Sequence, residues 1–418
     1  MTNTMAIGDC YSFLDAQSDE ITRSPAGFTG LITPSPAEYP EALHKLVVER
    51  YEVIKEWQTI TLTLFNQSLR GELDYAIAQL FLRELPDYLL RHHQNIFAEV
   101  HVNTPIFFRT DESTLGTILE VQSPGSRWGV YEQLQDYYME VGSSTILVPL
   151  SEIWVATLRH HIGADPVVHH LLDNLAHPAA ERYFAQKARR HARYYGYDKG
   201  IRALDCNFVR GHNYLSLRDE AFFPARRAAW AAGDLYYDLP PIAIFEQKIQ
   251  MCLPFWKETR QFYPDRVRQL FPYTSLLTRD GVTLEDGEVI KIDEFCELPQ
   301  TRREYYLKYG GPDISRNWGG RSVYNLARLS AAACATLLEN ISTAQENWLL
   351  QRACLQTSEV EYVRRDLSLA IDKVHPKYNC FYGPQSLLGV LVAHERISKT
   401  KGDDDTIATI ALRSAAMP

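Results

Sequence analysis

From residue 96 onward the sequence alternates short apolar runs with amphipathic stretches, which restricts the chain to folds that layer helices on a sheet. The stretch TPIFFRTDESTLGTILEVQSPG, residues 104–125, contains two apolar runs joined by a polar turn at Gly116, a pattern typical of a β-hairpin. The helical stretch WGVYEQLQDYYMEVG and the apolar run STILVPL follow it. The predicted fold class is therefore α/β, or α+β.

A chain of 418 residues is expected to form more than one domain. Residues 1–95 begin with prolines among small polar residues and continue with apolar positions at helical spacing, which predicts an extended arm and a helical cap. Residues 96–239 hold the hairpin and a Rossmann-like alternation. Residues 240–418 begin at a double proline that is expected to precede a helix, and they form the third predicted segment.

The composition of the chain excludes two classes of binding partner. The formal net charge is -9, so a nucleic-acid backbone would be repelled and no nucleic-acid partner is expected. No apolar run is long enough to span a bilayer, and the first residues lack the pattern of a signal peptide, so no membrane partner is expected. The seven cysteines stand singly without a CxxC pair, which favours a reducing compartment and predicts a cytoplasmic protein. A homo-oligomer is left open.

The stretch YYLKYGGPDISRNWGGRSVYNL, residues 305–326, predicts an anion-binding loop. Lys308 ends an apolar strand, which would fix its ammonium at one place on a sheet. Two glycine pairs follow, and glycines allow backbone N–H groups to approach an anion closely. The alternative is an ordinary turn loop beside a surface lysine, because the glycines match neither of the common phosphate-binding motifs.

Side chains of the predicted hairpin offer oxygen ligands. Residues two apart on a strand share a face, so Arg109 lies with Asp111 and Glu120 with Gln122. Magnesium is held by one or two carboxylates together with substrate phosphates. The alternatives are a solvated sheet face with an ordinary ion pair, or a metal strand elsewhere, at Asp205 and Asn207 in IRALDCNFVRG.

The order of RxD, ExQ, PG, PP…K, LK with GG, WGGR and WLLQ over residues 100–418 resembles the circularly permuted ATP-grasp ligases, which include the synthetase domain of glutathionylspermidine synthase. The resemblance implies an ATP-grasp core with a Rossmann-like pre-ATP-grasp domain within residues 96–239 and a nucleotide-binding region at 240–418. It implies metal ligands at Asp111 and Glu120. Gln122 stands where the family has Asn, and Arg109 falls on a nearby family arginine.

The same resemblance implies a nucleotide site. Lys308 falls on the strand lysine that contacts the phosphates, and Lys248 on a second phosphate-side lysine, with a surface helix lysine as its alternative. Gln351 falls at the hinge that binds adenine. The loop from Gly310 to Arg321, which includes Gly319 and Gly320, falls on the flexible flap over the phosphates. Arg321 would stabilise the transferred phosphoryl group; its alternative is a loop arginine paired with a surface acid.

The resemblance implies ATP and Mg²⁺ as cofactors and a carboxylate–amine ligase that forms an amide through an acyl phosphate. Small-molecule acid and amine substrates are its expected partners. The open alternatives are a kinase that stops after phosphoryl transfer and a degenerate binding protein. The residues quoted do not identify the acid or the amine.

Overall fold

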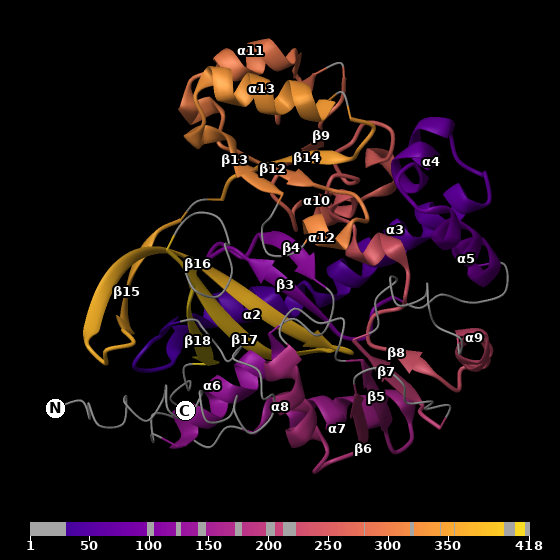
Figure 1. Ribbon diagram of the computed structural model, residues 1–418, viewed down its shortest axis with the longest axis vertical. Coiled ribbons are helices and arrows are strands. Elements are labelled where there is room, and N and C mark those ends of the chain that lie inside the picture. Colours follow the sequence, from indigo (N-terminus) through magenta and orange to yellow (C-terminus); the bar gives the residue numbers. More distant parts are fainter. Residues whose placement is uncertain are drawn as a thin grey trace.

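Figure 1 shows the computed structural model of the chain as three tiers, with a helix-backed sheet at one end, a large curved sheet in the middle and a parallel α/β unit at the other end. The structure describes residues 31–97, 104–122, 127–140, 148–171, 178–197, 205–211, 223–279, 281–317, 322–342, 344–354, 356–396 and 406–413.

Four helices of the N-terminal segment run from the large sheet to the side of the helix-backed sheet (Figure 1). Apolar residues at helical spacing give α3 a buried stripe that includes Ile54, Trp57 and Phe65. This stripe belongs to the largest apolar core, which also takes in residues of the large sheet. The helices are α2 (Glu41–Glu49), α3 (Tyr51–Leu69), α4 (Tyr75–Leu82) and α5 (Asp87–Phe97).

The large sheet has the strand order β15-β1-β18-β17-β16-β3-β4, and β2 pairs with β18 beside this path. The predicted hairpin is confirmed as β3 and β4, which pair antiparallel and lie at one edge. Its neighbour is the long strand β16, so residues far apart in the sequence share one surface. The strands are β1 (Leu31–Ile32), β2 (Ala37–Tyr39), β3 (Phe108–Glu112), β4 (Ile118–Gln122), β15 (Ser358–Val363), β16 (Leu369–Gly383), β17 (Ser386–Glu395) and β18 (Thr406–Arg413).

A buried ion pair ties the hairpin to the N-terminal helices. Arg50, between α2 and α3, donates to the Glu112 carboxylate of β3 at 3.0 Å, and both side chains are buried. The hairpin turn passes close to the same arginine at Gly116, which has φ of 77°; a Cβ there would lie 2.8 Å from the Arg50 guanidinium. Only glycine suits both conditions. The hairpin is therefore fixed to the N-terminal helices on the face that carries Glu112. Arg109 and Asp111 lie on its opposite face.

The parallel unit has the strand order β6-β5-β7-β8. All its pairings are parallel, as the alternation of strands and helices predicts. Its strands are β5 (Val167–Leu171), β6 (Arg193–Tyr197), β7 (Phe208–Arg210) and β8 (Tyr236–Tyr237), and the helices around them are α6 (Trp128–Glu140), α7 (Leu150–Ile162), α8 (Pro178–Ala188) and α9 (Phe223–Ala232).

The third tier, the β12 lobe, is a four-stranded sheet in the order β13-β12-β14-β9. Two helices cover the face that points away from the large sheet (Figure 1). Leu307 and Leu350 pack in the core beneath them. The strands are β9 (Thr274–Leu276), β12 (Tyr305–Tyr309), β13 (Val323–Asn325) and β14 (Trp348–Arg352); the covering helices are α11 (Ile292–Glu297) and α13 (Ala331–Ser342), with the short α10 (Asp265–Arg268), α12 (Ile314–Asn317) and the ribbon β10 (Val282–Thr283) and β11 (Val289–Ile290) nearby.

The prediction of a helix after the double proline is wrong. The chain forms two short 3₁₀ helices there, η2 (Ala243–Glu246) and η3 (Lys248–Met251). Every residue of η3 is buried, so no solvated face exists to support a longer amphipathic helix. The backbone N–H of Ile249 also bonds to the Gly310 carbonyl at 3.2 Å, which fixes this segment against the β12 lobe.

The predicted α/β class is confirmed. The boundaries at residues 95 and 239 stay predictions; the predicted second and third segments share a sheet, since β3 pairs with β16. None of the helices in the described ranges combines the length and hydropathy needed to cross a bilayer.

Candidate functional site

Lys308 joins the sheet of the β12 lobe to the large sheet. It lies on β12, and its ammonium donates across the gap to the backbone carbonyl of Leu119 on β4 at 3.2 Å. A second, shorter bond of 2.6 Å goes to Oε1 of Gln351 on the neighbouring strand β14. The Lys308 side chain is only 7% exposed. The predicted strand lysine is thus held between the sheets, and Gln351 positions it.

The buried charge on Lys308 destabilises the folded chain. Burial lowers the pKa of its ammonium from 10.5 to about 8, with Glu120 opposing the shift and Lys248 adding to it. A pKa lower in the folded than in the unfolded chain means that protonated Lys308 costs on the order of 3 kcal/mol of folding free energy at neutral pH. Stability alone does not favour a lysine here. A buried cation of this kind is typical of a site that receives an anion.

A second lysine lies beside the first. Lys248 on η3 contacts the Glu120 carboxylate of β4 at 2.9 Å and donates to the Asn317 backbone carbonyl at 2.7 Å. Burial pushes the pKa of Glu120 upward, but the charges of Lys248 and Lys308 outweigh it and leave the pKa below its ordinary value. The Glu120 side chain stays 22% exposed, so an ionised carboxylate faces the space between the sheets.

Asp111 is the centre of a polar network on the same face of the hairpin. Its Oδ1 accepts from Arg109 Nε at 3.0 Å and from Asn379 Nδ2 of β16 at 3.0 Å. Its Oδ2 accepts from Gln122 Nε2 at 3.3 Å. Arg127 donates to Asn379 Oδ1 at 3.1 Å, which completes the group. Arg109 is 2% exposed, so it orients Asp111 from within the sheet.

The hairpin register brings the two acids together. Asp111 pairs directly with Glu120, and Arg109 pairs with Gln122. Residues directly opposite on neighbouring strands have adjacent side chains on one face. The described residues hold no cluster of three or more metal-binding acids, histidines or cysteines. Two carboxylates and an amide oxygen form an all-oxygen set that fits magnesium when phosphates supply the other ligands.

The first glycine pair serves packing. A Cβ on Gly310 would lie 2.7 Å from Ile249, and one on Gly311 would lie 2.5 Å from the Glu84 carboxylate. These contacts explain both glycines without an anion. Gly319, Gly320 and Arg321 lie outside the described residues.

The alternative metal strand has other contacts. The Asn207 amide accepts from the Val167 backbone at 2.8 Å and donates to the Asp165 carbonyl at 3.0 Å, so it joins β5 to β7. Asp205 is exposed beside it. Neither contact of Asn207 involves the two lysines.

Sequence reasoning missed two residues of this site. Asn379 reaches Asp111 from a strand that follows it by 268 positions, and no local motif marks it. Asn317 lies within the loop predicted to be the flap, and its backbone carbonyl accepts a hydrogen bond from Lys248. The regular alternation of β16 could have placed Asn379 on a sheet face, but only the β16–β3 pairing shows which face.

The fold and site define a mixed α/β protein with a lysine and carboxylate cluster between two sheets. No protein-family model matches the chain, and no curated protein matches it in sequence. Among solved structures, a glutathione synthetase-like effector (GSS30) from Globodera pallida is similar over 98% of this chain and 97% of its own, at 10% identity and a TM-score of 0.47. A putative gamma-glutamylcysteine synthetase from Methylobacillus flagellatus is similar over 84% and 85%, at 10% identity and a TM-score of 0.39. At these TM-scores neither likeness carries weight in assigning a family or an activity.

Proposed function

We propose that the protein is an ATP- and magnesium-dependent ligase that joins a small carboxylic acid to an amine. The observation that carries the proposal is the buried ammonium of Lys308, which links β12 to β4 at a cost in folding free energy. It lies beside Lys248 and the ionised Glu120. Together with the ordered motifs of the sequence, this cluster supports an ATP-grasp nucleotide site.

In the proposed reaction an oxygen of the acid attacks the γ-phosphorus of ATP, and ADP leaves. The amine nitrogen then attacks the acyl carbon, inorganic phosphate leaves, and the nitrogen loses a proton. Both steps spread negative charge over phosphate oxygens, so preorganised cations lower their barriers. Lys308 and Lys248 would bind phosphate oxygens, and Arg321 would act on the transferred group.

Asp111 and Glu120 would hold the magnesium, with Gln122 offering an amide oxygen. The ion would supply charge neutralisation for the phosphates. Arg109 and Asn379 keep Asp111 oriented, because both donate to its Oδ1 at 3.0 Å. Lys248 would exchange its contact with Glu120 for one to phosphate when nucleotide enters.

The direct test is a screen for ADP and phosphate release. The purified protein is incubated with ATP, magnesium and pools of amino acids and amines, and products are identified by mass spectrometry. We expect release that requires both an acid and an amine, with a new amide at the summed mass less water. ADP formation that needs only one substrate and yields its phosphate ester would support a kinase instead. No turnover with any pool, together with no ATP binding, would support the degenerate alternative.

Nucleotide binding should take up a proton above pH 8. The free Lys308 ammonium has a pKa of about 8, so it is mostly neutral at pH 9 and must gain a proton to bind phosphate. Glu120, Asp111, Lys248 and Lys377 face it, and the low pKa of Glu120 keeps that group ionised throughout this range. Affinity for ATP should therefore fall about tenfold per pH unit well above pH 8.

Calorimetric titration at pH 8.5 in two buffers of different ionisation enthalpy measures this uptake. We expect most of one proton per ATP bound for the natural protein and almost none at pH 7. The matched control is Lys308→Arg, which keeps a permanent charge and should bind ATP without uptake. Equal uptake by both proteins would assign the proton to another group.

A further inference from the structure

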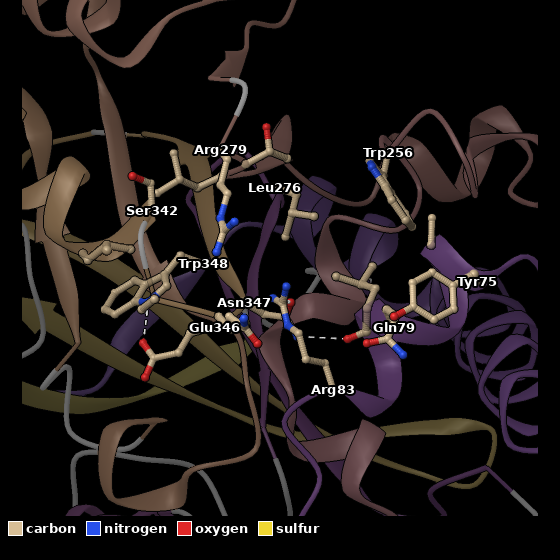
Figure 2. Close-up of a pocket in the computed structure, with 17 residues that line it drawn as sticks. Tyr75, Gln79, Arg83, Trp256, Leu276, Arg279, Ser342, Glu346, Asn347 and Trp348 are labelled. Carbon is tan, nitrogen blue, oxygen red and sulfur yellow. Dashed lines mark hydrogen bonds between the residues drawn. The ribbon is translucent and has the colours of Figure 1, made fainter.

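A cavity of about 380 Å³ lies between helix α4 and the β12 lobe, outside the lysine and carboxylate cluster. Figure 2 shows its labelled residues, which come from α4 and its C-terminal end, from the turn that follows η3, from the ends of β9 and β14 and from the end of α13. The β14 residues Leu349 and Trp348 belong to different apolar cores, on opposite faces of the sheet. Trp348 lines the cavity, whereas Leu349 packs with the core of the large sheet.

The described residues that line the cavity carry a net positive charge, because they include two arginines and one glutamate. The guanidinium groups of Arg83 and Arg279 point toward a common space (Figure 2). Arg279 has no hydrogen bond or ion pair within the described part of the chain, and Arg83 uses one nitrogen to reach Asn347 Oδ1 at 2.6 Å. Two guanidinium groups on one cavity repel each other unless an anion lies between them.

Among the described residues that line the cavity, Glu346 is the one carboxylate, and it is already neutralised. Both oxygens of Glu346 accept from Arg316, at 2.6 and 3.0 Å, and Oε2 also accepts from Trp348 Nε1 at 3.0 Å. The hydrogen bonds from Arg316 and, to a smaller extent, the charge of Arg83 lower the pKa of Glu346, whereas Arg279 makes no ion pair with this carboxylate. Donors on Arg83 and Arg279 therefore stay available to a ligand.

Apolar and aromatic groups supply the rest of the wall. Trp256, Tyr75 and Leu276 line the cavity around the two arginines (Figure 2). Such walls bury a flat apolar body, while a few polar groups fix its orientation. Arginine additionally stacks on flat rings.

We propose that this cavity binds a small molecule with a planar apolar body and one anionic group, held by Arg279 and Arg83. The site is separate from the lysine and carboxylate cluster, and the inference does not depend on the ligase activity. Aromatic carboxylates are the ligand class that matches both the walls and the charge.

The probe is 2-naphthoate, titrated into the full chain and followed by ligand-observed NMR and calorimetry. Arg279→Gln removes an anion contact and should weaken binding about tenfold. Ala76→Phe fills the cavity from the exposed side of α4 and should abolish the saturable binding signal. The matched control Arg302→Gln changes an exposed arginine of the same lobe that does not line the cavity, and it should bind as the natural protein does.

Neutral 2-naphthalenemethanol should bind at least about tenfold more weakly than 2-naphthoate, because it lacks the charge that the arginines contact. Lys308→Gln should leave naphthoate binding unchanged. Binding that survives both Arg279→Gln and Ala76→Phe, or that is lost in Lys308→Gln, would overturn the proposal. Absence of any saturable binding to the natural protein would overturn it as well. Thermal unfolding of each variant checks that the fold is retained.

Discussion

Lys308→Met should reduce ATP-dependent ADP formation by about a hundredfold or more, since removing one preorganised group that stabilises developing charge costs this much in other enzymes. The ammonium is fixed by two bonds, to Leu119 O at 3.2 Å and to Gln351 Oε1 at 2.6 Å. Its position is therefore set before nucleotide arrives. Methionine keeps most of the length of the side chain but offers neither charge nor donor.

Thermal stability is the control that shows whether Lys308→Met still folds. The folded chain disfavours the charged form of Lys308, so Lys308→Met should not melt below the natural protein at pH 7. Any gain in melting temperature over the natural protein should shrink as pH rises above 8, because Lys308 of the natural protein then loses its proton in the folded state only. Lys257→Met changes a lysine with an 84% exposed side chain and should leave turnover intact. Unchanged turnover in Lys308→Met would remove the phosphate role from this residue.

The hairpin was predictable because its determinants are local. Alternating apolar residues and a glycine turn specify β3 and β4, and the register then places Asp111 opposite Glu120. The strand that carries Lys308 was predictable for the same reason. The contact between Lys308 and β4 was not predictable, because it depends on how the two sheets pack.

The environment of Lys248 shows where local patterns fail. A double proline before an apolar run predicts a helix, but burial on every side and the bond from Ile249 to Gly310 produce a 3₁₀ turn instead. That turn is what directs Lys248 toward Glu120. Glycines likewise signal more than one role, since Gly311 makes room for the Glu84 carboxylate.

Glu120→Ala should abolish magnesium-dependent activity, whereas Asp205→Ala should leave it within about twofold of the natural protein, a difference near the limit of ordinary surface substitutions. Glu120 is ionised and partly exposed between the lysines, as a magnesium ligand must be. Asp205 stands instead beside Asn207, whose amide is used to join β5 to β7. Turnover measured against magnesium concentration separates the two strands.

A second readout does not depend on turnover. Manganese bound in the presence of ATP is measured by its electron paramagnetic resonance signal, and loss of a ligand typically weakens metal binding by at least about tenfold. Glu120→Gln keeps the size of the side chain and should show the same loss, because the amide lacks the charge that the metal requires. A loss confined to Asp205→Ala would assign the metal to Asp205 and the segment that precedes β7. Since Lys248 pairs with Glu120 at 2.9 Å, Glu120→Ala should also free that lysine and strengthen metal-free ATP binding, an effect that no metal site at Asp205 explains.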